Sequence, residues 1–288
     1  MMEHVSIDLW ATNLEPAVPD LASWLAALEA RVSQTAARGG HMLVLPEFAC
    51  AQWLSFAPLD LPTENTMGWL YETGEIALPA IATMAAQYGV SVLAGTIPFA
   101  SEVKDGVQTY FNRAWLLTPD GARHTQDKLS LTPLEVQSAG GVTVHGESIN
   151  VFEWNGLRTA MIICLDTEFT DLWSRLGGLN LDLIIIPAKT DMITGYNRVF
   201  SCARARAIEL QTANCSDGNQ PRFGCGPYTC RSVSQVAKWP GRGRSHSCFV
   251  GRQPSGCPRP GPTCSRERRL KLHGRMRRNP TEQHRYLR

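Results

Sequence analysis

Cys164 is the residue of this sequence best placed to act as a nucleophile. It follows the apolar stretch 159–163 and precedes the polar residues 166–168, which could begin a helix. A thiol at such a turn lies near the positive end of the helix dipole, which favours the thiolate, and near free backbone N–H groups that could bind an oxyanion. The sequence therefore predicts Cys164 as a nucleophile, and the alternative is a small buried cysteine that only packs.

Two further polar residues also follow predicted strands. Glu47 comes after the continuous apolar run 42–45, at the end where open α/β sheets place their chemistry, and could act as a general base. Lys128 leaves a predicted strand for a loop and is one of only three lysines before residue 215. The alternatives are a solvated loop carboxylate and a surface lysine.

Along the first part of the chain, segments with the period-two pattern of a strand are interspersed with segments whose apolar residues recur at helical spacing and with turn residues. Hairpins are predicted around Pro119-Asp120-Gly121 and around Asn155-Gly156. We expect strands at 5–9, 42–45, 90–94, 111–117, 123–126, 149–154, 157–163 and 181–186, and helices over 21–32, 81–88 and 198–211. Strands joined by both helices and hairpins predict an α/β fold with a mixed sheet flanked by helices.

Three sequence blocks resemble the nitrilase superfamily of carbon-nitrogen hydrolases, in its amidase-like branch. They are LVLPEF at 43–48, KLSLTPLE at 128–135 and IICLDTEF at 162–169. The stretch RARAIE at 204–209 is similar to the helix that follows the nucleophile in that family, so the resemblance covers residues 4–214. It implies a four-layer αββα sandwich with Glu47, Lys128 and Cys164 as the catalytic triad.

The resemblance also implies a mechanism. Cys164 would attack the carbon of an amide or nitrile, and Glu47 would take the thiol proton and later activate water. Lys128 and the backbone N–H of Leu165 would stabilise the developing anion. Glu135 matches a second glutamate that positions the lysine and the substrate in the family. A thioester on Cys164 would be the intermediate, and no metal or organic cofactor is needed.

The residues after the nucleophile favour a small-molecule amide over a nitrile as substrate. Nitrilases of the superfamily place Trp and Glu there, whereas this chain has Leu165 and Asp166. The stretch 189–199 resembles a less characterised branch that is sometimes fused to an acetyltransferase. Relatives commonly dimerise through outer helices, so a homodimer is expected.

The chain changes character at Asn214. Residues 1–214 contain 12 Lys/Arg and 23 Asp/Glu, whereas residues 215–288 contain 16 and 3, together with six of the nine cysteines. The second part has no alternation from which a strand could be predicted. We therefore expect a carbon-nitrogen hydrolase domain over 1–214 and an atypical, basic Cys/Pro/Arg-rich tail over 215–288, disordered if the gene is shifted in frame. Sequencing the genomic DNA around codon 214 tests that hypothesis.

Several alternatives stay open. The chain could be an inactive remnant of such a hydrolase, because the tail replaces the family's closing strands. It could be a Cys/His enzyme that uses His124 or His145 as base. Cysteines and His246 of the tail could bind zinc, although no regular Cx2C pair occurs, and the basic run 266–278 could bind nucleic acid but has no recognition fold.

The expected partners exclude nucleic acid and membranes. No apolar run approaches the roughly 20 residues that a spanning helix needs. The first residues have neither the basic nor the apolar part of a signal peptide, so a cytoplasmic location with reduced thiols is expected.

Overall fold

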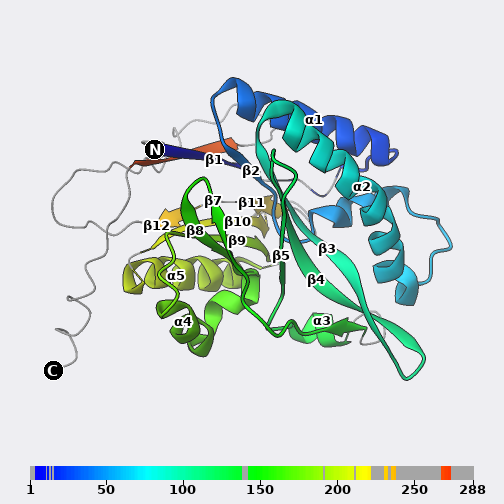
Figure 1. Ribbon diagram of the computed structural model, residues 1–288. Coiled ribbons are helices and arrows are strands. Elements are labelled where there is room, and N and C mark those ends of the chain that lie inside the picture. Colours follow the sequence, from blue (N-terminus) through cyan, green and yellow to red (C-terminus); the bar gives the residue numbers. More distant parts are fainter. Residues whose placement is uncertain are drawn as a thin grey trace.

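Two β-sheets lie face to face, and helices cover the outer side of each sheet (Figure 1). The computed structural model describes residues 4–10, 12, 14, 16–137, 142–190, 192–210, 212–221, 230–232, 235–237 and 267–273. This arrangement confirms the predicted four-layer αββα sandwich.

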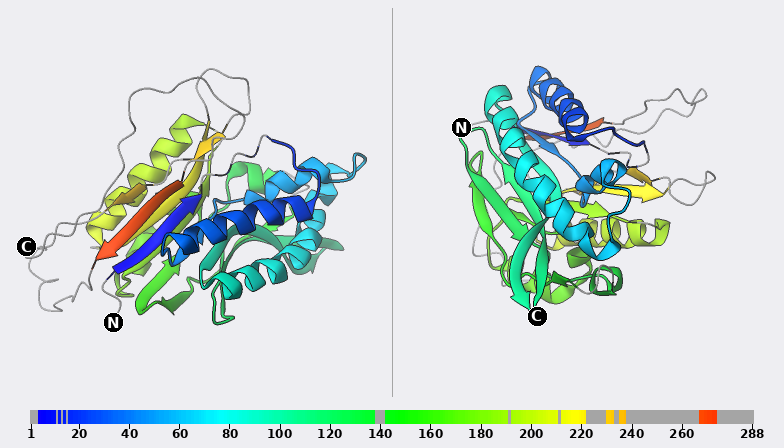
Figure 2. Two further views of the ribbon diagram at one scale, coloured as in Figure 1. Left: turned by 90° about the horizontal axis from the view of Figure 1, so that it is seen from above. Right: turned by 90° about the vertical axis from the view of Figure 1, so that its right-hand side faces the viewer.

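The first sheet is mixed and has the strand order β13-β1-β2-β3-β4-β5, with β6 beside β4. Its strands are β1 (His4–Trp10), β2 (Met42–Val44), β3 (Ser91–Lys104), β4 (Val107–Leu117), β5 (Arg123–Asp127), β6 (Thr143–Val144) and β13 (Glu267–His273). β1, β2 and β3 are parallel because α1 (Leu21–Ala37) and α2 (Thr66–Tyr88) carry the chain back between them. Figure 2 shows these two helices side by side on one outer face.

The second sheet has the order β11-β10-β9-β8-β7, with β12 beside β10. Its strands are β7 (Val151–Trp154), β8 (Leu157–Met161), β9 (Leu183–Lys189), β10 (Ala213–Pro221), β11 (Cys230–Ser232) and β12 (Gln235–Ala237). β8, β9 and β10 are parallel. The short 3-10 helix η4 (Cys164–Glu168) and then α4 (Thr170–Gly177) connect β8 to β9, and α5 (Ile193–Glu209) connects β9 to β10. The ends of β8 and β9 therefore meet at one edge of the sheet.

Alternating side chains divide the apolar core into layers. Met42 and Val44 of β2 face the second sheet, where Met161 and Ile185 lie, whereas Leu43 points outward to α1 and α2. On the far side of the second sheet, side chains of the sheet pack against side chains of α4 and α5. This buried set includes Ile162, Ile184, Ile186, Trp173, Leu176 and Ala203. The apolar runs 42–45, 160–163 and 183–186, which lie in or directly after β2, β8 and β9, are buried on both faces of their sheets, and this explains why polar residues do not alternate within them.

Both predicted hairpins are present. β4 pairs antiparallel with β5, and β7 with β8. Asn155 and Gly156 have φ angles of 50° and 73°, and this left-handed backbone is what a tight two-residue hairpin turn requires.

Several predicted boundaries differ from the structure. The largest differences are in α2, which begins at Thr66 and not at 81, and in β3, which continues to Lys104 and not to 94. β9 continues through Pro187 to Lys189, because pairing with β8 ends at Ile185 and the missing N–H of proline costs no bond on that side. Helix α5 begins at Ile193, five residues before the predicted start at 198.

The segment after residue 214 contains strands that the sequence pattern did not predict. β10 crosses that position and pairs parallel with β9 over seven residue pairs, and β13 pairs antiparallel with β1. Strand pairing uses backbone groups, so it does not require the alternation on which the sequence prediction depended. Most of 215–288 lies outside the described residues, and the division into a domain and a tail stays a prediction.

Among the described helices, none is both long enough and apolar enough to cross a membrane.

Candidate active site

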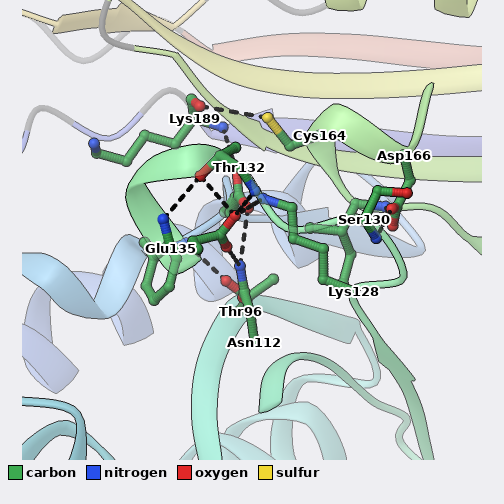
Figure 3. Close-up of polar contacts among 12 residues, drawn as sticks. Thr96, Asn112, Lys128, Ser130, Thr132, Glu135, Cys164, Asp166 and Lys189 are labelled. Carbon is green, nitrogen blue, oxygen red and sulfur yellow. Dashed lines mark hydrogen bonds and ion pairs between the residues drawn. The ribbon is translucent and has the colours of Figure 1, made fainter. Parts of the chain in front are cut away.

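The three predicted catalytic residues lie where strands of both sheets end. Figure 3 labels Lys128 and Cys164 among their polar neighbours. Glu47 follows β2, Lys128 follows β5, and Cys164 follows β8. Their exposed fractions are 2%, 2% and 5%, so all three side chains are buried. A solvated loop carboxylate and a surface lysine are therefore not what the fold contains at these positions.

Lys128 lies between two carboxylates. Its Nζ is 2.7 Å from Glu47 Oε1 and 2.8 Å from Glu135 Oε2. Burial opposes the charged form of Lys128, but the negative charges of Glu47 and Glu135 outweigh it and raise its pKa above the ordinary range. The side chain is thus a buried ammonium that uses two of its three N–H donors on these carboxylates.

Glu135 belongs to the short helix α3 (Pro133–Gln137). Its Oε2 also accepts hydrogen bonds from the backbone N–H of Thr132 at 2.8 Å and from the Thr132 hydroxyl at 2.9 Å. Burial raises the pKa of Glu135, but Lys128 and these donors lower it by more, so the net pKa is below the ordinary value. The structure brings Glu135 together with the three predicted catalytic residues.

The turn that carries Glu47 is packed tightly against β3. Phe48 has a φ of 50°, and its N–H donates to Thr96 Oγ1 at 2.9 Å. Gly95 has a φ of 74°, and a Cβ there would be 2.1 Å from the carbonyl oxygen of Pro46. Only glycine fits this close approach, which fixes the backbone next to Glu47.

Cys164 has a left-handed backbone, with a φ of 46°. This conformation costs a non-glycine residue roughly 1–2 kcal/mol and is typical of functional turns. Its thiol donates to the carbonyl of Lys189 at 3.4 Å, while the N–H of Lys189 donates to Glu47 Oε2 at 3.0 Å. One peptide segment therefore contacts both the nucleophile and the carboxylate.

The predicted preference of Cys164 for the thiolate is not what the structure gives. Burial and the neighbouring charge of Glu47 raise the pKa of the thiol well above its ordinary value, although Lys128 opposes this. The helix after Cys164 is a single 3-10 segment of five residues, which has little dipole to offset these effects. The resting group is a thiol that needs a base. Leu165, whose N–H was predicted to bind the anion, is half-buried in η4.

Asp166 was not predicted as a site residue. It is fully buried and accepts hydrogen bonds from three backbone N–H groups, those of Ser130 at 2.6 Å, Leu129 at 3.2 Å and Ile163 at 3.3 Å. Burial raises the pKa of Asp166 to about 6, and the three donors oppose that rise. Asp166 thus ties the loop after Lys128 to the turn of the nucleophile.

Asn112 of β4 is a second residue that the sequence analysis missed. Its Nδ2 donates to Glu47 Oε1 at 3.0 Å and to Glu135 Oε1 at 2.7 Å. The available signal was a polar residue inside a predicted strand, which did not by itself indicate a site.

The two histidines of the Cys/His alternative have other contacts. His124 stacks on Phe152, with ring centroids 4.2 Å apart, and His145 Nδ1 bonds to the carbonyl of Leu129 at 3.0 Å. Within the described residues no contact joins either ring to Cys164. Cys225, His246, Cys248, Cys257 and Cys264 of the zinc alternative lie outside the described residues, as does the side chain of Cys230.

The family of the chain follows from its match to a protein-family model. The family model described as "Carbon-nitrogen hydrolase" matches residues 11–218. The chain belongs to the carbon-nitrogen hydrolase family. The resemblance seen in the three sequence blocks is therefore confirmed.

Relatives of the chain include hydrolases and amidases. Probable hydrolase YhcX of Bacillus subtilis (strain 168) is 30% identical over 168 residues, which cover 58% of this chain and 31% of that protein. Deaminated glutathione amidase of Yersinia enterocolitica is 25% identical, over 55% of this chain and 57% of that protein. The deaminated glutathione amidase of Synechocystis sp. (strain PCC 6803 / GT-S) is 26% identical, over 66% of this chain and 70% of that protein. The chain thus spans less than two thirds of the first two relatives.

Solved structures of the same fold extend the comparison. An amidase from Nesterenkonia sp. superposes with a TM-score of 0.65 at 16% identity, covering 94% of this chain and 90% of that one. XC1258 from Xanthomonas campestris, described as a CN-hydrolase superfamily protein, superposes with a TM-score of 0.62 at 22% identity. The match covers 82% of this chain and 83% of that one. At these identities the likeness shows the shared fold.

Proposed function

We propose that this chain hydrolyses the carbon–nitrogen bond of a small-molecule amide, with Cys164 as nucleophile and a thioester as intermediate. The observation that carries the proposal is the buried cluster in which Glu47 contacts the ammonium of Lys128 and the peptide segment that holds Cys164. A carboxylate base, a thiol and a cation for the developing anion are the groups that this reaction requires.

In the first half of the reaction, the thiol proton moves to Glu47 while the sulfur of Cys164 bonds to the amide carbon. The carbonyl oxygen becomes an anion, which the third N–H of Lys128 and the N–H of Leu165 stabilise. Glu47 then returns the proton to the nitrogen, the C–N bond breaks, and ammonia or an amine leaves. The acyl group remains on Cys164 as a thioester.

In the second half, Glu47 takes a proton from water, and the resulting hydroxide adds to the thioester carbon. The S–C bond breaks, the carboxylic acid leaves, and the proton returns to the sulfur of Cys164. The raised pKa of the thiol is consistent with a base acting during attack rather than a thiolate formed beforehand. Glu135 positions Lys128 in this scheme. No step uses a metal or organic cofactor.

The relatives support an amide as substrate class. Two of them are named deaminated glutathione amidases, and a mutant of the Nesterenkonia sp. AN1 amidase carries the acetamide moiety of fluoroacetamide covalently at its active site cysteine. The residues Leu165 and Asp166 after the nucleophile favour an amide over a nitrile. A homodimer and a cytoplasmic location stay predictions.

The test is ammonia release from a panel of primary amides by purified protein, with Cys164→Ala as the inactive variant and Cys202→Ala as the matched control. Cys202 lies on α5, outside the cluster. Activity that Cys164→Ala abolishes and Cys202→Ala leaves unchanged supports the proposal. Equal background rates for all three proteins would mean that the chain is an inactive remnant.

A further inference from the structure

Asn112 is joined to the candidate active site by both its backbone and its side chain. It lies on β4 with no exposed surface, and its carbonyl oxygen accepts a hydrogen bond from the N–H of Lys128 at 2.9 Å. The strand therefore holds Asn112 directly beside the start of the lysine loop.

The side-chain amide of Asn112 bridges two carboxylates. Its nitrogen donates to Glu47 Oε1 at 3.0 Å and to Glu135 Oε1 at 2.7 Å, which uses both of its hydrogens. The opposite orientation would place the amide oxygen against two carboxylate oxygens, so the hydrogen-bond network fixes which atom is nitrogen. Asn112 and Lys128 together form a closed ring of donors and acceptors with the two glutamates. Figure 3 labels Asn112, Lys128 and Glu135 of this ring.

This ring distinguishes the two oxygens of Glu47. Oε1 accepts from both Lys128 and Asn112, whereas Oε2 accepts from the N–H of Lys189. The carbonyl of that same residue accepts from the thiol of Cys164. Two donors thus hold one oxygen of Glu47, and the other oxygen contacts the residue that also contacts the thiol.

We propose that Asn112 is a positioning residue, which holds Glu47 and Glu135 against Lys128 and directs Glu47 Oε2 at the Cys164 thiol. The inference rests on the proposed function, because it gives Asn112 the task of aligning the base. The buried carboxylate of Glu47 and the half-buried carboxylate of Glu135 share one cation here, and a neutral donor between them reduces their repulsion without adding charge.

Asn112→Leu removes both donors and keeps a side chain of similar shape. The matched control is Gln126→Leu on the paired strand β5. Gln126 is also a buried amide, 1% exposed, and bonds to backbone groups of Asp127, Ser148 and Asn150. Both substitutions remove the hydrogen bonds of a buried amide, so both should lower the stability of the fold. Only Asn112→Leu should change the pH dependence of the reactivity of the Cys164 thiol.

The primary readout is the rate at which iodoacetamide alkylates Cys164, followed by peptide mass spectrometry between pH 6 and 10.5. It does not need turnover, so it separates failure of this inference from failure of the proposed function. In Asn112→Leu the midpoint of the pH dependence should move to lower pH, because the Glu47 charge that disfavours the thiolate no longer faces the sulfur. Gln126→Leu should keep the wild-type midpoint.

Where an amide is hydrolysed, Asn112→Leu should lower kcat by about 100-fold, as expected for misplacement of a catalytic group, and leave KM nearly unchanged. An unchanged alkylation midpoint in folded Asn112→Leu, or an equal shift in Gln126→Leu, would overturn the inference. If Asn112→Leu does not fold, Asn112→Ser should give a smaller shift in the same direction, and no shift in that variant would also overturn it.

Discussion

Replacing Lys128 with methionine tests whether the buried cluster is held together by its single cation. Methionine has a similar length and no charge, so Lys128→Met leaves Glu47 and Glu135 facing each other without the ammonium that lies 2.7 and 2.8 Å from them. The side chain of Lys128 is 1% exposed, so bulk water solvates the two carboxylates little in its place. Removing one partner of a buried ion pair costs about 3–5 kcal/mol, and we expect a loss of that size in the free energy of unfolding at pH 7.

The loss should depend on pH. Lys128 lowers the pKa of Glu135, so in the wild type this pair stabilises the fold at neutral pH and loses that contribution as the pH falls through the lowered pKa. In Lys128→Met the carboxylate of Glu135 is no longer held ionised by Lys128 and takes up a proton more readily in acid, which relieves its repulsion with Glu47. The difference in the free energy of unfolding between Lys128→Met and the wild type should therefore be smaller at pH 5 than at pH 7.

Urea unfolding followed by tryptophan fluorescence measures both quantities, with Lys104→Met as control. Lys104 is exposed at the end of β3, where a substitution should change stability by no more than about 0.5 kcal/mol. The double variant Lys128→Met/Glu135→Gln should recover part of the loss, since only one of the two carboxylates remains. Equal costs for the two lysines, or a cost that does not shrink in acid, would refute the reasoning.

Two further predictions concern the backbone around the cluster. Asp166→Asn should lower stability by about 2–3 kcal/mol, because an amide nitrogen would face backbone donors, while Asp171→Asn on the exposed face of α4 should change little. Because burial raises the pKa of Asp166 to about 6, its own contribution falls as the pH rises from about 4 through 6, and urea unfolding of Asp166→Asn should lack that slope. Gly95→Ala should cost more than about 3 kcal/mol by thermal or urea unfolding, since its Cβ would overlap the carbonyl of Pro46. Gly106→Ala has a similar φ of 79° but open space, so a cost above about 2 kcal/mol there would contradict this explanation.

Local pattern in the sequence was sufficient for most of the strands before residue 214 and for the triad candidates. Apolar runs ending at Pro46-Glu47 and at Cys164 predicted strands with polar residues at their ends, and Asn155-Gly156 predicted a hairpin. These signals are local because the backbone period and the turn residues depend on neighbours in the chain. Glu135 came from the family resemblance.

The tertiary structure alone decided how the cluster works. The N–H of Lys189 reaches Glu47 across 142 residues, and Asn112 meets Glu135 only because β4 lies beside the lysine loop. The direction of the Cys164 pKa shift, opposite to the sequence expectation, depends on complete burial and on the charge of Glu47, and neither can be read from residues next to the thiol. Strand β10 is a similar case: its pairing with β9 uses backbone groups, and its sequence has no side-chain alternation from which a strand could be predicted. The sequence thus determined which residues could react, and the packing of two sheets determined their charges, partners and orientation.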